Sequence, residues 1–114
     1  MADISGMAHL QLTVSDMARS KPFYETLLHS MHMVTLIDDP SYFYCIGGKT
    51  GLAISPADPD LVADGFHQRR PGLHHLCFRA RSREDVDELY RTALELKATI
   101  VRAPEEAELS LIHI

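Results

Sequence analysis

The stretch PGLHHLCFRA at residues 71–80 decides the fold, because an earlier segment of the chain has the same design. That segment is HLQLTVSDMARS at residues 9–20. In each, a His-Leu pair heads a short apolar run that passes directly into residues favouring the start of a helix. Two copies of one strand-to-helix unit are therefore predicted, with His9 and His75, separated by 75 − 9 = 66 residues, at equivalent places.

The composition predicts one small soluble domain. The chain has 114 residues, of which 46% are hydrophobic and 24% are charged, which is enough to bury a core without disulfides or a structural metal. No apolar run approaches the roughly 18 residues of a membrane-spanning helix. The N-terminal MADISGM lacks the basic residues and apolar core of a secretory signal, which predicts a cytoplasmic protein. Cys45 and Cys77 lie in apolar runs and are predicted to stay reduced.

The charge balance argues against two classes of partner. Eleven Lys and Arg against 16 Asp and Glu give a net charge of 11 − 16 = −5. This opposes binding to a nucleic-acid backbone or to an anionic membrane surface. The local basic cluster His67, Arg69 and Arg70 is interpreted as part of a solvated loop. A small molecule is the expected partner.

Residues 7–14 alternate between apolar and polar side chains, as a half-buried strand does. The apolar face carries Leu10, Leu12 and Val14, and the other face carries His9, Gln11 and Thr13. A helix follows, with Ser15 or Asp16 as its cap or, as a second possibility, Ser20. A start at Asp16 would place Pro22 inside the helix and predicts a kink there.

The rest of the first half is predicted to form three strands. The helix carries Phe23 and Leu27 at helical spacing, and they are expected to cover the apolar face of the first strand. Strands are then predicted at Met33–Ile37, Tyr42–Ile46 and Leu52–Ser55, separated by a turn at DDPS and a glycine-rich turn at GGKTG. The first half thus has the order strand, helix and three strands.

The second half repeats this order and then stops short. Pro56–Gly72 is predicted to be a linker, and Leu73–Arg79 is predicted to be a strand. Its alternation places His74 on one face and, on the other, His75, Cys77 and Arg79.

A helix is predicted next, since Ser82 and Asp85 form a capping box ahead of apolar residues at helical spacing. Those residues are Val86, Leu89, Tyr90, Ala93 and Leu96. Ala98–Val101 is expected to begin another strand, and ten residues follow Pro104.

This order of elements resembles the vicinal oxygen chelate superfamily. The two segments that carry the resemblance are HLQLTVSDMARSKPFYETLL, at the start of the first half, and GLHHLCFRARSREDVDELY, at the start of the second. That superfamily includes glyoxalase I, fosfomycin and bleomycin resistance proteins, extradiol dioxygenases and methylmalonyl-CoA epimerase. The resemblance implies an α+β fold in which paired βαβββ modules enclose a cavity. We expect a single domain over residues 1–114, with a first module at about 6–55, a linker at 56–72 and a second module at 73–114 that lacks its last strands.

The resemblance also implies a divalent metal ion held by His9 and His75, which match the first-strand ligands of the two modules. Strand parity supports both, because each lies opposite the apolar residues of its strand, and it excludes His74. Imidazole ligands suit Zn, Fe, Ni or Mn, and a carboxylate would ordinarily complete the site.

That carboxylate has no clear counterpart. The strand Leu52–Ser55 contains none, and Glu105, Glu106 and Glu108 are interpreted as a solvated acidic run. The tail Leu109–Ile114 is interpreted either as an edge strand, from which His113 could approach the cavity, or as a truncated or non-native end. The second alternative leaves sheet edges open to association, such as a homodimer.

Two functions from different classes follow. The first is a glyoxalase-like or dioxygenase-like metalloenzyme, of lyase, isomerase or dioxygenase type, in which the ion acts as a Lewis acid on a small oxygen-rich substrate. The second is a metal-free module that sequesters a small molecule, as the bleomycin resistance proteins do. A non-functional fragment is a third interpretation. A nucleophilic pair of Cys77 and His75 is disfavoured. Tyr42–Tyr44 are expected in the core and the cavity wall. Arg79 is expected either to pair with an anionic substrate or to reach solvent.

Overall fold

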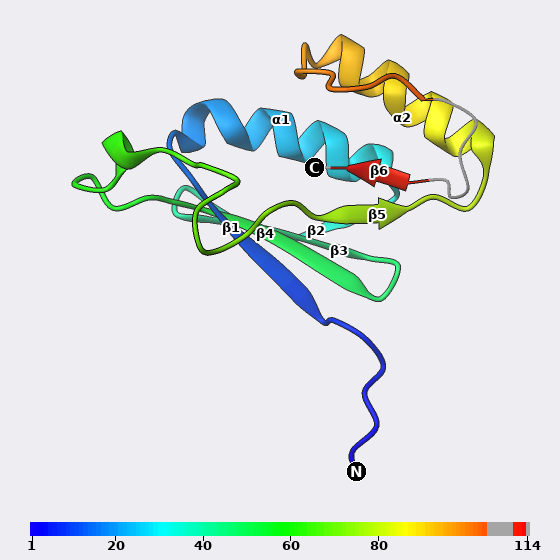
Figure 1. The fold of residues 1–114 in the computed structure, drawn as a ribbon, viewed down its shortest axis with the longest axis horizontal. Helices are drawn as coiled ribbons and strands as arrows, with labels where there is room; N and C mark the ends of the chain where they lie inside the picture. Colours follow the sequence, from blue (N-terminus) through cyan, green and yellow to red (C-terminus); the bar gives the residue numbers. More distant parts are fainter. Residues whose placement is uncertain (105–110, 114) are drawn as a thin grey trace. The chain divides into compact units, whose positions relative to one another are not determined.

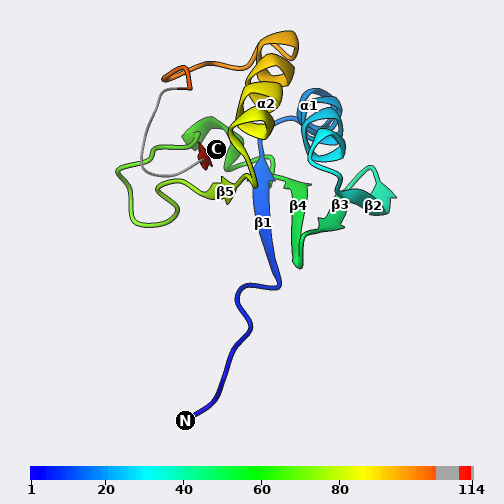
Figure 2. The same cartoon turned by 90° about the vertical axis from the view of Figure 1, so that its right-hand side faces the viewer.

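The computed structural model describes residues 1–104 and 111–113, which divide into two compact units, Met1–Gly65 and Phe66–Ile114 (Figure 1). In the first unit, residues 1–8 extend away from the start of the first strand, as both Figure 1 and Figure 2 show. Among the described residues, the structure contains no helix long and apolar enough to cross a membrane.

The first unit is a mixed four-stranded sheet with a helix on one face. Its elements are β1 (His9–Val14), α1 (Met17–Ser30), β2 (Val34–Asp39), β3 (Tyr42–Gly47) and β4 (Thr50–Pro56), followed by the short 3-10 helix η1 (Val62–Asp64). The strand order is β1-β4-β3-β2, in which β1 runs parallel to β4 and the other pairs are antiparallel. The predicted order of strand, helix and three strands is confirmed, and the fold is α+β.

The core of the first unit lies between α1 and the sheet. Phe43 is paired in register with Ile54, and Cys45 with Leu52, so these four side chains share one face. All four are fully buried, as is Leu28 of α1. In Figure 2 the helix is seen nearly end-on beside this face. Each buried Leu, Ile or Phe contributes about 1.5–3 kcal/mol, so this layer holds α1 on the sheet.

Helix α1 begins at Asp16, one of the predicted caps. The Asp16 carboxylate accepts a hydrogen bond from the Arg19 N–H at 3.3 Å, and the Asp16 carbonyl accepts one from the Ser20 N–H at 2.8 Å. Ser20 is therefore a residue of the first turn and not the cap. The helix continues without interruption through Pro22, which lacks the N–H that would bond to the Ala18 carbonyl.

Helix α1 ends in a Schellman turn. The N–H of His32 donates to the His29 carbonyl at 3.1 Å, and the N–H of Met33 donates to the Leu28 carbonyl at 3.1 Å. His32 occupies the left-handed position of this turn, with φ of 62°. Glycine is the residue best suited to that conformation, so the histidine is held there at some cost in stability.

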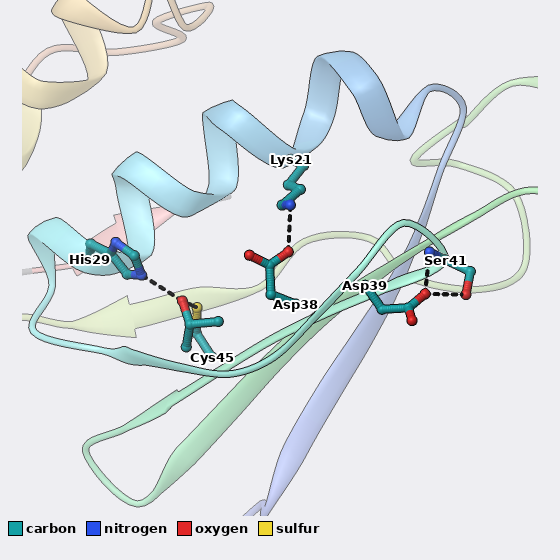
Figure 3. A network of polar contacts seen from close by, with 7 residues as sticks. Lys21, His29, Asp38, Asp39, Ser41 and Cys45 are labelled. Atoms are coloured by element: carbon teal, nitrogen blue, oxygen red, sulfur yellow. Dashed lines mark hydrogen bonds and ion pairs between the residues drawn. The ribbon is translucent and has the colours of Figure 1, made fainter.

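The turn between β2 and β3 is held by Asp39. Its carboxylate accepts hydrogen bonds from the Ser41 backbone N–H at 2.9 Å and from the Ser41 hydroxyl at 2.8 Å (Figure 3). The backbone bond, followed by the hydroxyl bond, lowers the pKa of the Asp39 carboxyl below its ordinary value. Because the folded-state pKa is the lower one, this stabilisation is present above the unfolded-state pKa and is lost as the pH falls through the folded-state pKa.

Ser41→Ala removes the hydroxyl donor, so we expect the pKa of Asp39 to rise towards its ordinary value. An NMR titration of the side-chain carboxyl carbons measures this change. Ser30→Ala is the control, because the Ser30 hydroxyl bonds to the Leu27 carbonyl instead. An unchanged titration of Asp39 in Ser41→Ala would contradict the assignment.

The second unit contains β5 (Cys77–Arg79), α2 (Arg83–Glu95) and β6 (Leu111–His113) in its described part. Strands β5 and β6 pair antiparallel. The predicted start of the helix is confirmed, because the Ser82 hydroxyl accepts a hydrogen bond from the Asp85 N–H at 3.1 Å. Val86 and Leu89 form the buried stripe of α2.

Two strand predictions in the second half are wrong. The strand predicted at Leu73–Arg79 begins only at Cys77, because β6 supplies partners for three residues and a strand exists only where its backbone groups are paired. Residues 98–101 form no strand. Strand β6 falls within the predicted edge strand Leu109–Ile114, whereas Glu105, Glu106 and Glu108 lie outside the described residues.

Candidate functional site

The face of the sheet opposite α1 gathers aromatic and polar side chains. Register pairs Gln11 with Ala53, and Ala53 with Tyr44, so these three residues share a face. His9 and Ser55 lie two residues along β1 and β4, and Tyr42 two residues along β3, on that same face. We call this set the polar face: His9, Gln11, Tyr42, Tyr44 and Ser55. The predicted orientation of His9 opposite the apolar residues of its strand is confirmed by the burial pattern of β1.

Tyr44 is the centre of the polar face. Its ring meets the His9 ring edge-on, with centroids 6.1 Å apart at 74°, and its centroid lies 6.1 Å from that of Tyr42. The ring can lie there because residue 51 is glycine, since a Cβ at Gly51 would overlap the Tyr44 ring. A half-buried tyrosine at this place is consistent with the cavity wall expected from the sequence.

A polar pair stands beside these rings. The Gln11 side-chain amide donates to the Ser55 hydroxyl at 2.9 Å, joining β1 to β4. Sites for small organic ligands combine aromatic surface with a few polar groups that fix orientation. The polar face contains both, within one unit of the chain.

An open hollow of about 380 Å³ lies at one end of this face. Two basic side chains, His32 from the turn after α1 and Lys49 from the turn between β3 and β4, are among its eight lining residues. Val34 and Ile46 provide apolar lining. No local sequence pattern predicts this hollow, because it forms where two turns meet.

On the face of the sheet that packs against α1, polar contacts connect α1 to β2. Lys21 forms an ion pair with Asp38, and this hydrogen-bonded contact raises the pKa of Lys21 (Figure 3). The His29 ring lies 2.7 Å from the Thr35 hydroxyl, which lies 3.6 Å from the Cys45 sulfur. Burial raises the pKa of the Cys45 thiol, so this chain of contacts holds a neutral thiol and not a nucleophilic thiolate.

In the second unit, His74 and His75 lie against one another. Their Nδ1 atoms are 2.8 Å apart, and the Gln68 amide donates to the His74 carbonyl at 3.1 Å. The prediction that the two rings point to opposite faces is wrong, because residues 73–76 form no strand. Cys77 is exposed, and burial raises the pKa of its thiol more than the Arg79 charge lowers it. Cys45 and Cys77 are both free thiols in the structure.

The predicted metal ligands have separate surroundings. His9 belongs to the first unit, beside Tyr44, and His75 belongs to the second, beside His74. Across residues 1–104 and 111–113, no three His, Cys, Asp or Glu side chains gather as a metal site would require. An open catalytic site ordinarily has three protein ligands. Ligation by His9 and His75 stays a prediction.

Comparison with known proteins matches almost the entire chain to one family. The family model of the Glyoxalase/Bleomycin resistance protein/Dioxygenase superfamily matches residues 6–112. A crystal structure of a Bacillus halodurans protein provisionally assigned as a glyoxalase is similar, with 30% sequence identity and a TM-score of 0.73. The match covers 80% of this chain and 68% of that one. The curated proteins contain no significant match.

Proposed function

Because the chain belongs to the glyoxalase/bleomycin resistance protein/dioxygenase superfamily, we propose that its first unit binds a small organic molecule on the polar face of the sheet. The observation that carries the proposal is the group of three rings, His9, Tyr44 and Tyr42, beside the Gln11–Ser55 pair. The rings offer apolar contact surface, and the pair offers an amide and a hydroxyl for a ligand oxygen.

Tyr44 makes the largest contribution in this proposal. It contacts both other rings and lies directly over Gly51. Tyr44→Ala should therefore weaken binding of a neutral aromatic probe, benzyl alcohol, about tenfold, since an aromatic contact contributes about 0.5–1.5 kcal/mol beyond the area that it buries. NMR titration measures the affinity and maps the perturbed amides.

Tyr90→Ala is the matched control for this experiment. Tyr90 is a half-exposed tyrosine of α2, in the second unit. Equal weakening by the two variants, or amide shifts that avoid β1, β3 and β4, would refute the proposed site.

The second candidate is the metalloenzyme. The observation that favours it is the position of His9, the first residue of β1, on the polar face. In this alternative, His9 and His75 contribute imidazoles to a divalent ion of the Zn, Fe, Ni or Mn type, which would polarise neighbouring oxygens of a small substrate.

Metal content after exhaustive dialysis separates the two candidates. Stoichiometric metal that is lost in both His9→Ala and His75→Ala supports the metalloenzyme. Protein that is free of metal, does not take it up again, and still binds benzyl alcohol supports the binding module. The control is His67→Ala, which changes a histidine outside the predicted ligand pair.

A further inference from the structure

The hollow at the end of the sheet continues the polar face. Val34 is paired with Ile46, Ile46 with Gly51, and Gly51 with His9. These four residues lie side by side across the sheet on one face. A molecule seated on Tyr44 and His9 would therefore reach Val34 and Ile46 in the hollow without crossing another element of the unit.

The charge of the hollow is opposite to that of the chain. Among its eight lining residues, two are basic and none is acidic. The entire chain, by contrast, has 16 Asp and Glu residues against 11 Lys and Arg residues, with its seven His residues counted as neutral. A local cationic patch in an acidic protein attracts anions at short range, where the distant negative charges are screened.

The two basic side chains have no acidic partner within the described part of the chain. Lys21 forms an ion pair with Asp38, whereas neither His32 nor Lys49 forms an ion pair or a hydrogen bond with a carboxylate of a described residue. The Lys49 ammonium and a protonated His32 would both donate hydrogen bonds to an anion, and neutral His32 would still donate one.

The close approach of two turns creates this arrangement. A Cβ at Gly47 would lie 3.0 Å from the Met33 Cα and 3.3 Å from the His32 carbonyl oxygen. The absence of a side chain at Gly47 thus lets the turn after α1 settle against the end of β3. His32 and Lys49, 49 − 32 = 17 residues apart in the sequence, consequently line one hollow.

Both basic residues are held in a backbone conformation that favours glycine. His32 has φ of 62° in the Schellman turn, and Lys49 has φ of 64° in the two-residue turn between β3 and β4. Side chains at such positions cost stability. The negative end of the α1 dipole also opposes an anion near His32, so Lys49 should contribute more to anion affinity than His32.

We propose that this hollow binds the anionic group, a carboxylate or a phosphate, of the small molecule whose body lies on the polar face. The inference rests on the proposed function, since it assigns a charge to the ligand of that same face. Lys49 and His32 hold the anionic group, and Val34 and Ile46 contact the apolar part next to it.

The experiment compares three probes of similar shape: benzoate, phenyl phosphate and neutral benzyl alcohol. Wild-type protein should bind at least one of the two anions about tenfold more tightly than benzyl alcohol, because charge-assisted hydrogen bonds are about twice as strong as neutral ones. Lys49→Gly should remove most of that preference and leave benzyl alcohol binding unchanged. Lys49→Arg should retain it, and added salt should reduce it.

Lys97→Gly is the matched control. Lys97 occupies the same left-handed position at the end of α2, with φ of 58°, and is not among the residues of the hollow. His32→Gly, Lys49→Gly and Lys97→Gly should each raise the melting temperature by about 4 °C or more, because glycine suits the left-handed backbone conformation at all three positions. His32→Gly and Lys49→Gly should lose affinity for the anions, whereas Lys97→Gly should not.

The outcomes separate this inference from the proposed function. If benzyl alcohol binds on the polar face but the anions bind no better, or if Lys49→Gly keeps the preference, the inference is overturned and the proposed function stands. If none of the probes binds, both are overturned. The stronger of the two anions identifies the ligand group as a carboxylate or a phosphate.

Discussion

Phe43→Ala should lower the free energy of unfolding of the first unit by about 3–5 kcal/mol, the usual cost of emptying a buried aromatic site. Phe43 is a residue of β3, is paired in register with Ile54 of β4, and is fully buried on the face of the sheet that packs against α1. The Lys21 ammonium lies 5.7 Å from its ring centroid, so the truncation removes core packing and a cation–π contact together. Urea denaturation followed by circular dichroism measures the loss.

Two further variants keep this prediction testable. Phe43→Leu should cost less, about 1–2 kcal/mol, and gives a folded protein if the alanine variant does not fold. Tyr44→Ala, on the opposite face of the same strand and only half-buried, should cost less stability than Phe43→Ala while losing more affinity for benzyl alcohol. A larger loss of stability at Tyr44 than at Phe43 would reverse the assignment of the two faces.

Pro22→Ala should raise the free energy of unfolding by about 2 kcal/mol, because proline inside a helix costs about 3 kcal/mol relative to alanine and part of this is offset in the unfolded chain. Pro22 is exposed and lies beyond the first turn of α1. Alanine would restore an N–H for the Ala18 carbonyl and remove the clash of the proline ring with it.

The control for this variant is Pro40→Ala. Pro40 lies in the turn between β2 and β3, outside any helix, where a proline ring preorganises the turn. It should leave stability unchanged or lower it, as the denaturation midpoint will show. Equal stabilisation by both variants would contradict the prediction, because a gain in a turn that contains no helix could not come from a restored helical hydrogen bond.

The first unit could be predicted from the sequence because its signals are local. Alternation in residues 9–14, the cap at Asp16 and the turns between the strands each determine structure within a few residues. The placement of His9 on the face opposite the core follows directly from that alternation.

The structure of the second unit differs from the prediction where a strand depends on a neighbouring strand for its backbone hydrogen bonds. Residues 73–76 have the composition of a strand, but β6 pairs only with residues 77–79. Without pairing, the alternation no longer separates His74 from His75, and their rings meet. The hollow was missed for a similar reason, since it requires the Gly47 backbone to meet the turn at His32, and no local pattern encodes that approach.

The parallel pairing of β1 with β4 predicts the order in which the strands of the first unit pair during folding. Strands β2, β3 and β4 are joined by short turns, whereas His9 meets Gly51 across 51 − 9 = 42 residues of chain. Closing that long loop costs more entropy, so we expect this pairing to form after the two hairpins. On this expectation, His9 reaches its place only when the unit is complete, so a ligand that contacts His9 should stabilise the entire unit by mass action and not merely the segment that it touches.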